Sequence, residues 1–523
     1  MNQQRSENSW PNSWPSENLV IAVGVGLLGF AIYLWQLSVP EFIQFYDSGV
    51  YLAAPIHLVS GVIPYRDFTF LEPPGIILLL SPLGLVSRIW GSHDAFIVGR
   101  VVSAFVTALN AGLLAYLVRH RGRIAMLISG VGLVLLPVAS FVSSGIRLEP
   151  YCICFILLGS LFVFSREEKL GTLRNRDLAI SGVFFGLAAL IKLWAIFPFV
   201  ALVLTLLPRY GRRVFHMVGV SGAVFISVCL PFLALAPVKF ISQVFVEQLN
   251  REAIPSDTVG ITHRLIFLTG LNPTSLVSTA AVAVFVFGLL ACLVAATFWR
   301  RDQRGHLDTF LVLAALLSVL AILAAPESYN YYGYFTAPFL LGVVGILFGH
   351  WSPVAGNLIR RIPVSKPLRR ISSWLVTISA AALTFALVLY VTTFYTNYAW
   401  ANGYWSRDFN AITHLIPRGS CVVYDQVSYG VFANRLQSSK PGCPSVVDPS
   451  GMWMAWGYQL IPPAHAFTAE WKSYFEKAQY VVLSHPGAQG IPWDKNLSDW
   501  FKRNYQLISS SSYVHIYRQV ARR

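Results

Sequence analysis

The residues of this sequence that could carry chemistry gather in one polar stretch between two apolar segments. Residues 45–75 read "FYDSGVYLAAPIHLVSGVIPYRDFTFLEPPG" and include Asp47, Arg66, Asp67 and Glu72. A carboxylate within hydrogen-bond reach of a hydroxyl can accept its proton as the oxygen attacks an electrophile, and a guanidinium can hold a phosphate. The residue types therefore allow general-base chemistry beside an anionic group.

Each of these residues also has a simpler structural interpretation. Asp47 precedes a stretch with helix-like spacing at 48–61, so it could act only as a helix N-cap. Glu72 stands before two prolines, and proline is favoured at the start of a helix. Arg66 and Asp67 are neighbours that could form a local salt bridge. Taken singly, the residues do not decide between structure and chemistry.

The composition places this stretch in an integral membrane protein. Of 523 residues, 55% are hydrophobic and only 12% are charged, whereas roughly one quarter of the residues of soluble domains are charged. The 39 Lys and Arg outnumber the 24 Asp and Glu, but the basic residues form short clusters between apolar runs rather than one stripe. This pattern is typical of cytoplasmic loops and does not indicate a nucleic-acid partner.

The fold class that follows is an α-helical polytopic membrane protein with about eleven transmembrane helices. The apolar runs lie at about 19–38, 94–118, 124–144, 149–165, 178–191, 195–208, 214–236, 276–299, 308–325, 334–350 and 372–396. Residues 178–208 could instead form one long tilted helix, but a single crossing would move the basic cluster at 209–213 to the outside. We therefore expect two short helices with a turn at 191–198.

Charge placement decides the topology. With the N-terminal tail inside and no crossing at 75–90, five basic clusters lie inside and hold eighteen Lys and Arg, against seven in the outer connections before residue 400. A crossing at 75–90 would invert every later loop, which the positive-inside rule disfavours. The sequence thus predicts a disordered cytoplasmic tail at 1–18, a transmembrane domain at 19–398 with a first outer loop at 39–93, and a multi-pass location in the plasma membrane.

The C-terminal residues 399–523 differ in character and would lie outside the cytoplasm. Short strand-like runs alternate there with helical patterns: strands are predicted at 421–425, 480–484 and 513–518, and helices at 468–478 and 497–505. This indicates a small α/β domain. Cys421 and Cys443 lie within it, and a disulfide between them is expected if that side of the membrane is oxidising. The other four cysteines lie in apolar runs without the spacing of a zinc site.

Three further charged residues lie near membrane depth on the outer side. Arg147 and Glu149, in "RLEPY", enter a predicted span from outside, and Lys192 lies in the turn at 191–198. Such charges cost free energy unless they pair or face an aqueous cavity. Mutual pairing of Arg147 with Glu149 is one solution, and a shared cavity is the other.

The arrangement as a whole resembles the GT-C superfamily of polytopic membrane glycosyltransferases, in particular the branch of the protein O-mannosyltransferases and the aminoarabinose transferases. The matching elements are an acid just after the first span in "YDSGVYLAAPIHLVSG", a basic and aromatic stretch in "IPYRDFTF", and an acid beside a proline pair in "LEPPG". The resemblance extends over most of the chain, because it includes the spans, the split short pair, a tyrosine-rich outer loop and the trailing α/β domain.

The resemblance implies an inverting enzyme that moves a sugar from a polyprenyl-phosphate carrier to a hydroxyl of a lipid, glycan or protein at the outer face of the membrane. It assigns the role of general base to Asp47, and Glu72 would orient the acceptor or a basic partner. Outer-loop cations and hydroxyls would stabilise the leaving phosphate. The residues expected to do so are Arg66, Arg147, Lys192, Tyr331, Tyr332 and Tyr334. The tyrosines could alternatively belong to an ordinary interfacial aromatic belt.

Two departures from the family pattern matter. Pro73 stands where related lipid A enzymes have a lysine after the loop-ending acid, so Arg66 or Lys192 would have to replace it. Ser48 and Gly49 follow Asp47 directly, so no second acid completes a metal site there. We therefore expect chemistry without a metal ion or cofactor.

Two other functional classes compete with a transferase. A transporter or lipid flippase is also polytopic, but it predicts inverted repeats with matched broken helices, which the sequence lacks. A non-catalytic membrane scaffold would make Asp47 and Glu72 dispensable. The identity of the sugar and of the acceptor depends on the shape of the pocket, which sequence patterns do not give.

Overall fold

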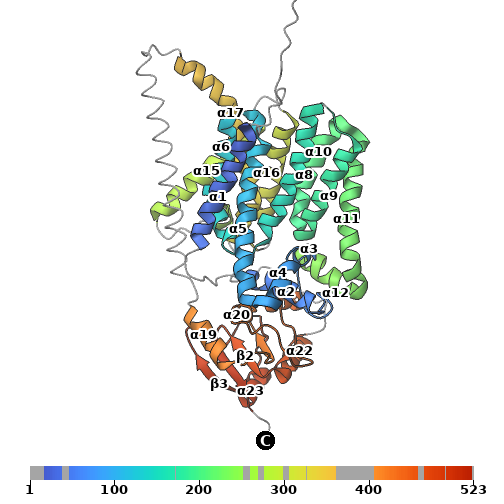
Figure 1. Ribbon diagram of the computed structural model, residues 1–523, viewed down its shortest axis with the longest axis vertical. Coiled ribbons are helices and arrows are strands. Elements are labelled where there is room, and N and C mark those ends of the chain that lie inside the picture. Colours follow the sequence, from blue (N-terminus) through green and yellow to red (C-terminus); the bar gives the residue numbers. More distant parts are fainter. Residues whose placement is uncertain are drawn as a thin grey trace, which may run out of the picture.

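The computed structural model shows a bundle of helices with a small sheet at one end (Figure 1). The described residues are 17–37, 46–170, 172–250, 260–268, 276–298, 305–325, 327–360, 406–457, 464–488 and 490–520. Most of the predicted N-terminal tail and the predicted span at 372–396 lie outside these ranges.

Long apolar helices form the bundle because, in lipid, a helix satisfies all of its backbone hydrogen bonds internally. They are α1 (Glu17–Leu37), α5 (Ser92–Leu117), α6 (Arg123–Leu135), α7 (Pro137–Ser143), α8 (Leu148–Leu170), α9 (Asn175–Ile191), α10 (Ile196–Tyr210), α11 (Val214–Leu235), α15 (Leu276–Phe298), α16 (His306–Ala324) and α17 (Gly333–Arg360). These helices coincide with the predicted apolar runs that lie in the described part of the chain.

The chain is an α-helical polytopic membrane protein. Within the described ranges, six helical stretches are long and apolar enough to cross a membrane, or seven if α6 and α7 form one span. Helices α6 and α7 meet at 58°, because Leu136, which precedes Pro137, is extended. The predicted number of eleven spans is not confirmed, because this count is six or seven and the predicted span at 372–396 lies outside the described residues.

The predicted turn at 191–198 is present. Helix α9 ends at Ile191, the backbone of Lys192 is extended, and a short 3₁₀ turn, η2 (Leu193–Ala195), leads into α10. Helix α9 packs along α11, and a Cβ atom at Gly182 would lie 2.5 Å from the carbonyl oxygen of Met217. Glycine at this position therefore allows the close approach of the two helices.

The short helices α2 (Tyr46–Val59), α3 (Gly75–Leu79) and α4 (Ser81–Trp90) lie at the end of the bundle that faces the sheet (Figure 1). The other short elements are α12 (Pro237–Ile241), the π-helical turn η4 (Ser242–Val246), α13 (Glu247–Asn250) and α14 (Ile261–Phe267). Helix α4 has 10 residues, which span about 15 Å, only half of a hydrocarbon layer of about 30 Å. The segment 75–90 also includes α3, and that it does not cross the membrane stays a prediction.

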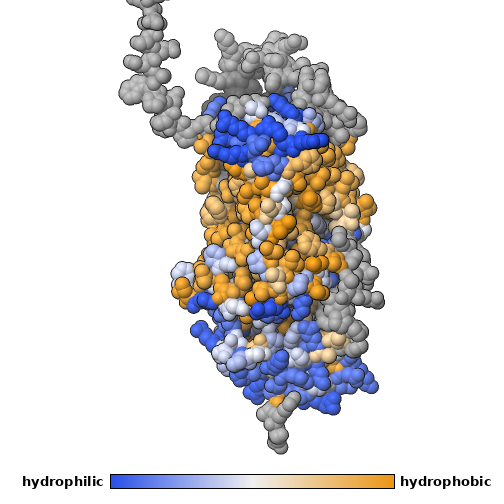
Figure 2. All heavy atoms as spheres, turned by 90° about the vertical axis from the view of Figure 1, so that its right-hand side faces the viewer, coloured by the Kyte–Doolittle hydropathy of each residue, from blue (hydrophilic) through white to orange (hydrophobic). Residues whose placement is uncertain are grey.

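Hydrophobic residues form a band around the middle of the molecule, and hydrophilic residues cover its two ends (Figure 2). The sheet forms one hydrophilic end. Helix α5 begins beside it, because the Ser92 hydroxyl donates a hydrogen bond to the Val431 carbonyl at 2.6 Å. It ends at the other side of the band, at the basic turn η1 (Arg119–Arg121). This basic cluster and the sheet thus lie at opposite ends, as the charge pattern predicts.

The C-terminal residues 406–520 form a mixed four-stranded sheet with the order β1-β2-β4-β3. Its strands are β1 (Val422–Tyr424), β2 (Tyr480–Leu483), β3 (Tyr505–Ser510) and β4 (His515–Gln519), and its helices are α19 (Ser406–Leu415), α20 (Ser428–Phe432), α21 (Pro449–Gly457), α22 (Ala464–Lys477) and α23 (Lys495–Asn504). Strands β1 and β2 are parallel, whereas β4 is antiparallel to both of its neighbours. Strand β3 was not predicted, because it lies at the edge of the sheet and half of its residues are polar.

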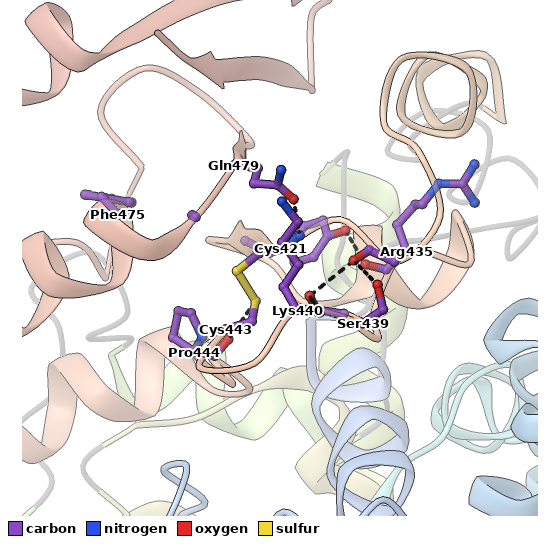
Figure 3. The surroundings of a disulfide bond; sticks show 12 residues. Cys421, Arg435, Ser439, Lys440, Cys443, Pro444, Phe475 and Gln479 are labelled. Carbon is purple, nitrogen blue, oxygen red and sulfur yellow. Dashed lines mark hydrogen bonds between the residues drawn. A yellow bond between two sulfur atoms is a disulfide. The ribbon is translucent and has the colours of Figure 1, made fainter. Parts of the chain in front are cut away.

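Cys421 and Cys443 form a disulfide, with their sulfur atoms 2.08 Å apart (Figure 3). The core beneath it centres on Trp471 and Phe475 of α22, which are both fully buried. The ring of Phe475 lies 5.1 Å from that of Phe501 on α23. We call residues 406–520 the C-terminal unit.

The C-terminal unit packs tightly against α2. A Cβ atom at Gly49 would lie 2.3 Å from the Ser428 hydroxyl oxygen of α20, so glycine at this position permits the contact. On α5, the backbone N–H of His93 donates a hydrogen bond to the Asn434 side chain at 3.0 Å. These contacts fix the start of α2, which carries Asp47, against the C-terminal unit.

Candidate active site

A cavity of about 340 Å³ lies where α2, the ends of bundle helices and the C-terminal unit meet. Its lining residues are Tyr46, Asp47, Val50, Tyr51, Phe70, Leu71, Glu72, Arg147, Lys192, Tyr329, Tyr331, Tyr332, Asp448, Ser450, Gly451 and Met454. Segments that are several hundred residues apart in the sequence therefore form one site.

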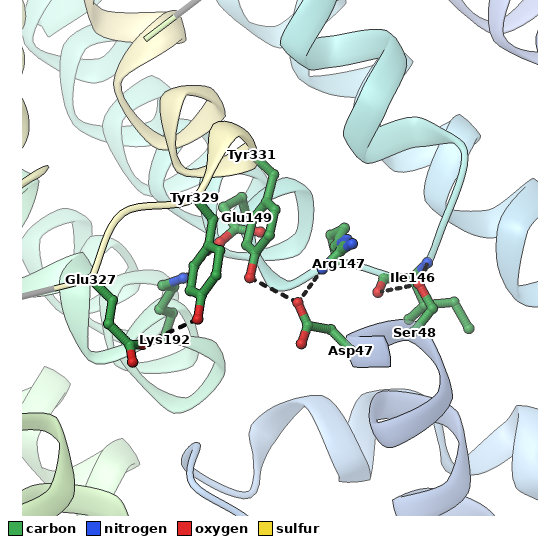
Figure 4. A network of polar contacts seen from close by, with 9 residues as sticks. All are labelled: Asp47, Ser48, Ile146, Arg147, Glu149, Lys192, Glu327, Tyr329 and Tyr331. Carbon is green, nitrogen blue, oxygen red and sulfur yellow. Dashed lines mark hydrogen bonds and ion pairs between the residues drawn. The ribbon is translucent and has the colours of Figure 1, made fainter. Parts of the chain in front are cut away.

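Asp47 lies in the first turn of α2, and its Oδ2 atom is held by two side chains from distant segments (Figure 4). Nη1 of Arg147 forms an ion pair with Oδ2, and the hydroxyl of Tyr331 donates a hydrogen bond to the same oxygen at 2.8 Å. The Arg147 guanidinium also lies 4.2 Å from the centroid of the Tyr331 ring. The three side chains therefore hold one another in place at the cavity wall.

The other carboxylate oxygen of Asp47, Oδ1, accepts no hydrogen bond from any residue that the structure describes, whereas Oδ2 accepts two. The Asp47 side chain is 24% exposed and Arg147 only 4%. Asp47 bonds to distant side chains rather than to the backbone of its own helix, so N-capping does not explain its position. The arrangement presents an immobilised carboxylate with one open oxygen to the cavity.

A second buried ion pair borders the same cavity. Nζ of Lys192 donates a hydrogen bond to Oε1 of Glu149 at 2.6 Å, and Nζ lies 4.4 Å from the centroid of the Tyr332 ring. Glu149 therefore pairs with Lys192, and Arg147 pairs with Asp47, in place of the mutual pairing considered from the sequence. Side chains two residues apart at a helix start do not face each other, which explains the difference.

The segment that carries Glu72 is held from two sides. Tyr65 is fully buried, has a positive φ of 67°, and donates a hydrogen bond from its hydroxyl to the Glu72 carbonyl at 2.7 Å. From the opposite side, Oε1 of Gln243 accepts a hydrogen bond from the Phe70 backbone at 3.0 Å. A non-glycine residue with positive φ is strained, so the surrounding packing must impose this turn.

The C-terminal unit supplies the remaining wall of the cavity. The Tyr46 hydroxyl donates a hydrogen bond to Oδ1 of Asp448 at 2.6 Å and accepts one from the Ser450 backbone at 2.8 Å. Burial and the Asp448 carboxylate raise the pKa of Tyr46, so that its hydroxyl stays protonated and donates. Because Tyr46 directly precedes Asp47, this contact couples the C-terminal unit to the carboxylate of the cavity.

Comparison with known proteins gives the chain a functional class. Residues 70–326 match the sequence profile of Glycosyltransferase family 87, a range that includes Glu72, Arg147 and Lys192. The chain is a polytopic membrane glycosyltransferase with the GT-C fold. No curated protein matches the glycosyltransferase in sequence.

Solved structures show the shared fold of the glycosyltransferase. ArnT from Cupriavidus metallidurans bound to undecaprenyl phosphate matches with a TM-score of 0.59 at 14% identity, over 96% of this chain and 98% of that chain. The archaeal oligosaccharyltransferase AglB from Archaeoglobus fulgidus, in complex with an inhibitory peptide and a dolichol-phosphate, matches with a TM-score of 0.52 at 14% identity, over 95% of this chain and 74% of that chain. Both proteins are similar to the glycosyltransferase over nearly its whole length.

Most of the predicted site residues of the glycosyltransferase meet in the cavity, but two do not. Arg66 is exposed and forms a bidentate pair with its neighbour Asp67, so the local salt bridge accounts for it. Tyr334 is fully buried inside the bundle, where its hydroxyl accepts a hydrogen bond from Asn110 at 3.2 Å. Tyr334 follows Tyr331 by almost one helical turn into the bundle, which takes its side chain away from the cavity.

Metal binding has no geometric support in the described residues of the glycosyltransferase. No group of three or more His, Cys, Asp or Glu side chains in those ranges is arranged to hold a metal ion. Two carboxylates at this site have basic partners, since Asp47 pairs with Arg147 and Glu149 pairs with Lys192.

Sequence reasoning missed several residues of this site in the glycosyltransferase. Glu149 was noted only as a partner of Arg147, and Tyr329 and the residues of the C-terminal unit were not assigned to the site. Asp448 had a local signal, because "VVDPSG" places an acid directly after an apolar run. Its contact with Tyr46 spans 402 residues, and no local pattern reports a contact of that range.

Proposed function

We propose that this glycosyltransferase moves a sugar from a polyprenyl-phosphate donor to an acceptor hydroxyl at the membrane surface, with Asp47 as the general base. The observation that carries the proposal is the Asp47 carboxylate, which has one oxygen held by Arg147 and Tyr331 and the other open to the cavity. Such a group is positioned to accept a proton from a hydroxyl that enters the cavity.

The proposed reaction is a single displacement at the anomeric carbon of the sugar. The acceptor oxygen forms a bond to this carbon while its proton passes to Oδ1 of Asp47. The bond between the anomeric carbon and the phosphate oxygen breaks, and polyprenyl phosphate leaves with the bonding electrons. Because attack and departure occur on opposite faces, the configuration inverts.

Two cations at the cavity would stabilise the leaving phosphate. Arg147 and Lys192 are both buried, at 4% and 7% exposure of their side chains. Charged hydrogen bonds are stronger in such an environment than in water, and preorganised donors need no rearrangement during the reaction. Each cation already has a carboxylate partner, which stabilises its buried positive charge before a donor binds.

The proposed class of donor is inferred from solved structures that share the fold of this chain. ArnT was solved with undecaprenyl phosphate and AglB with a dolichol-phosphate, and both of these ligands are polyprenyl phosphates. The cavity of this chain combines paired cations with a location beside the hydrophobic band, which suits a phosphate attached to a lipid tail. Glu72 lines the same cavity and would orient the acceptor or a basic partner.

We also propose that the C-terminal unit faces the outside of the plasma membrane. Its disulfide and its position opposite the basic end of the bundle support this orientation. The test is Lys495→Cys in a chain whose four unpaired cysteines are alanine. An impermeant maleimide should label intact cells, and labelling only after lysis would contradict the orientation.

The function itself can be tested in two steps. Cells that lack the protein should accumulate a polyprenyl-phosphate sugar and lose a component of their surface glycans. The purified chain in nanodiscs should then release polyprenyl phosphate from that donor when an extract of the mutant envelope is added. Transport of the donor lipid across vesicles without transfer of sugar would favour a flippase instead.

A further inference from the structure

A second cavity, of about 380 Å³, lies at the other end of α2, between this helix and the C-terminal unit. His57 and Ser60 line it from the side of α2, and Tyr424, Gln437 and Lys440 line it from the C-terminal unit. Lys440 lies on the segment that leads to the disulfide at Cys443 (Figure 3). None of the residues that line this second cavity takes part in the contacts described above for the candidate active site.

The side chain of His57 offers hydrogen-bonding groups to a ligand in the second cavity. His57 is only 8% exposed, and its ring packs 5.9 Å from that of Phe68. In the part of the chain that the structure describes, neither ring nitrogen of His57 has a hydrogen-bond partner. Burial lowers its pKa to about 4, so the ring is neutral at physiological pH and offers one donor and one acceptor. These two ring nitrogens are therefore available to hydrogen-bond a ligand in the cavity.

The remaining polar groups define the chemistry of that ligand. The cavity wall offers the hydroxyls of three serines, the carboxamide of Gln437 and the ammonium of Lys440, and it contains no carboxylate. The amide of Gln437 donates a hydrogen bond to the Ser60 hydroxyl at 2.8 Å, which leaves its carbonyl oxygen available. The ring of Tyr424 and the side chain of Pro444 add apolar faces. Alternating donors and acceptors beside flat apolar surfaces match the edges and faces of sugar rings.

The two cavities are lined by the same two segments of the chain. Both are lined by α2 and by the segment 446–451: Val446 faces the second cavity, whereas Asp448 and Ser450 face the catalytic one. His57 follows Asp47 by ten residues on α2, which corresponds to about 15 Å along the helix axis. A chain of several linked sugars is long enough to span this distance.

We propose that the second cavity binds an oligosaccharide segment of the acceptor, several sugar units away from the hydroxyl that is glycosylated. The inference deepens the proposed function, because it names the acceptor class as a glycan, but it can be tested without turnover. Binding at a distance from the reacting centre would give the enzyme a preference for longer acceptors.

The first experiment measures binding to the full-length protein in nanodiscs. The probes are neutral oligosaccharides of increasing length, with inorganic phosphate and a neutral peptide of similar size for comparison. We expect an oligosaccharide to bind more tightly as its length increases, and phosphate not to compete with it. Binding of phosphate or peptide without binding of any oligosaccharide would overturn the proposal.

Two variants connect this binding to the second cavity. Lys440→Ala removes an exposed cation at the rim, and His57→Phe keeps an aromatic ring against Phe68 but removes both nitrogens. Each should weaken oligosaccharide binding roughly 10-fold, the scale of one or two hydrogen bonds. Lys495→Ala and His414→Ala, at exposed positions elsewhere on the C-terminal unit, are the matched controls. Unchanged binding in Lys440→Ala would refute the site even if His57→Phe fails to fold.

The assignment of Asp47 as the general base and the proposal of the second site can be refuted independently. Asp47→Asn should retain oligosaccharide binding, because Asp47 does not line the second cavity. If Asp47→Asn keeps full turnover while Lys440→Ala weakens oligosaccharide binding, only the assignment of the base is wrong. If turnover depends on Asp47 but no oligosaccharide binds, only the second site is wrong.

Discussion

Two pairs of an aspartate with an arginine lie at opposite ends of the bundle. They have the same residue types, but they differ in which carboxylate oxygens are bonded and in how exposed the acid is. At the end near the C-terminal unit, Arg147 pairs with Oδ2 of Asp47, and the Asp47 side chain remains 24% exposed. At the other end, Arg121 bonds both oxygens of Asp308, and Asp308 is only 6% exposed. Both pairs connect segments about a hundred or more residues apart.

The difference separates a structural pair from one that is available for chemistry. Asp308 has both oxygens held by one guanidinium, is almost fully buried and lines neither of the two cavities. Asp47 has one oxygen held and one open, and it borders a cavity. Fixed geometry together with an unfilled acceptor is what a general base requires. The two pairs therefore predict opposite outcomes when the acids are replaced.

The largest effect is expected at Asp47. Asp47→Asn keeps the shape of the side chain but cannot accept a proton at neutral pH. Transfer from the polyprenyl-phosphate donor should fall roughly 100-fold or more, while expression and thermal stability change little. Asp67→Asn is the matched control, because it makes the same substitution at an acid of the same loop outside the cavity. Wild-type turnover in Asp47→Asn would show that the Asp47–Arg147 pair is structural, like the Asp308–Arg121 pair.

Asp308 should show the reverse behaviour. Asp308→Asn leaves Arg121 facing an amide donor and should destabilise the protein by roughly 2–3 kcal/mol, as for other partly buried ion pairs that lose one member. The midpoint of thermal unfolding in nanodiscs should fall. Turnover per folded molecule should stay close to that of the wild type, and a loss of turnover similar to that of Asp47→Asn would show that the two pairs are not distinct.

Asp425 extends the comparison to a buried acid held by hydroxyl and backbone donors. Burial raises its pKa from 3.8 to about 6, against the opposing effect of hydrogen bonds from Ser484. The folded state thus binds this proton more tightly than the unfolded state, so stability is present below about pH 4 and is lost as the pH rises through 6. Asp425→Asn should raise stability at pH 7.5 by on the order of 2 kcal/mol and leave it unchanged near pH 4.

The control for Asp425 is Asp499→Asn, at an acid on α23 of the same unit. It should leave the dependence of the unfolding temperature on pH as it is in the wild type. Equal pH dependence in the wild type and in Asp425→Asn would show that another group carries the effect.

The smallest effect is expected at Tyr331. Tyr331→Phe removes the hydrogen bond to Oδ2 of Asp47 but keeps the ring beneath the Arg147 guanidinium. The loss of one hydrogen bond, about 1 kcal/mol, should lower kcat roughly 5-fold. The KM for the donor should not change, because Tyr331 would act by positioning Asp47. A change in KM alone would instead place Tyr331 in donor binding.

The sequence by itself determined the membrane class and the positions of the helices, and it predicted Asp47 as the main acid. Long runs without charge leave a helix as the only stable state in lipid, so composition alone is sufficient for that prediction. The charges near membrane depth also had to be paired or exposed to water, which singled out Arg147 and Lys192 before any geometry was known. The separation of α9 from α10 followed from the same reasoning about charge.

The tertiary structure decided which charge pairs with which and which residues complete the site. Arg147 could pair with a neighbour two positions away or with Asp47, and only the approach of α2 to the start of α8 selects between them. Tyr334 and Tyr331 differ by three positions, yet one points into the bundle and the other into the cavity. Asp448 reaches Tyr46 because the C-terminal unit packs on α2. Such contacts depend on packing between distant segments, which local residue patterns do not encode.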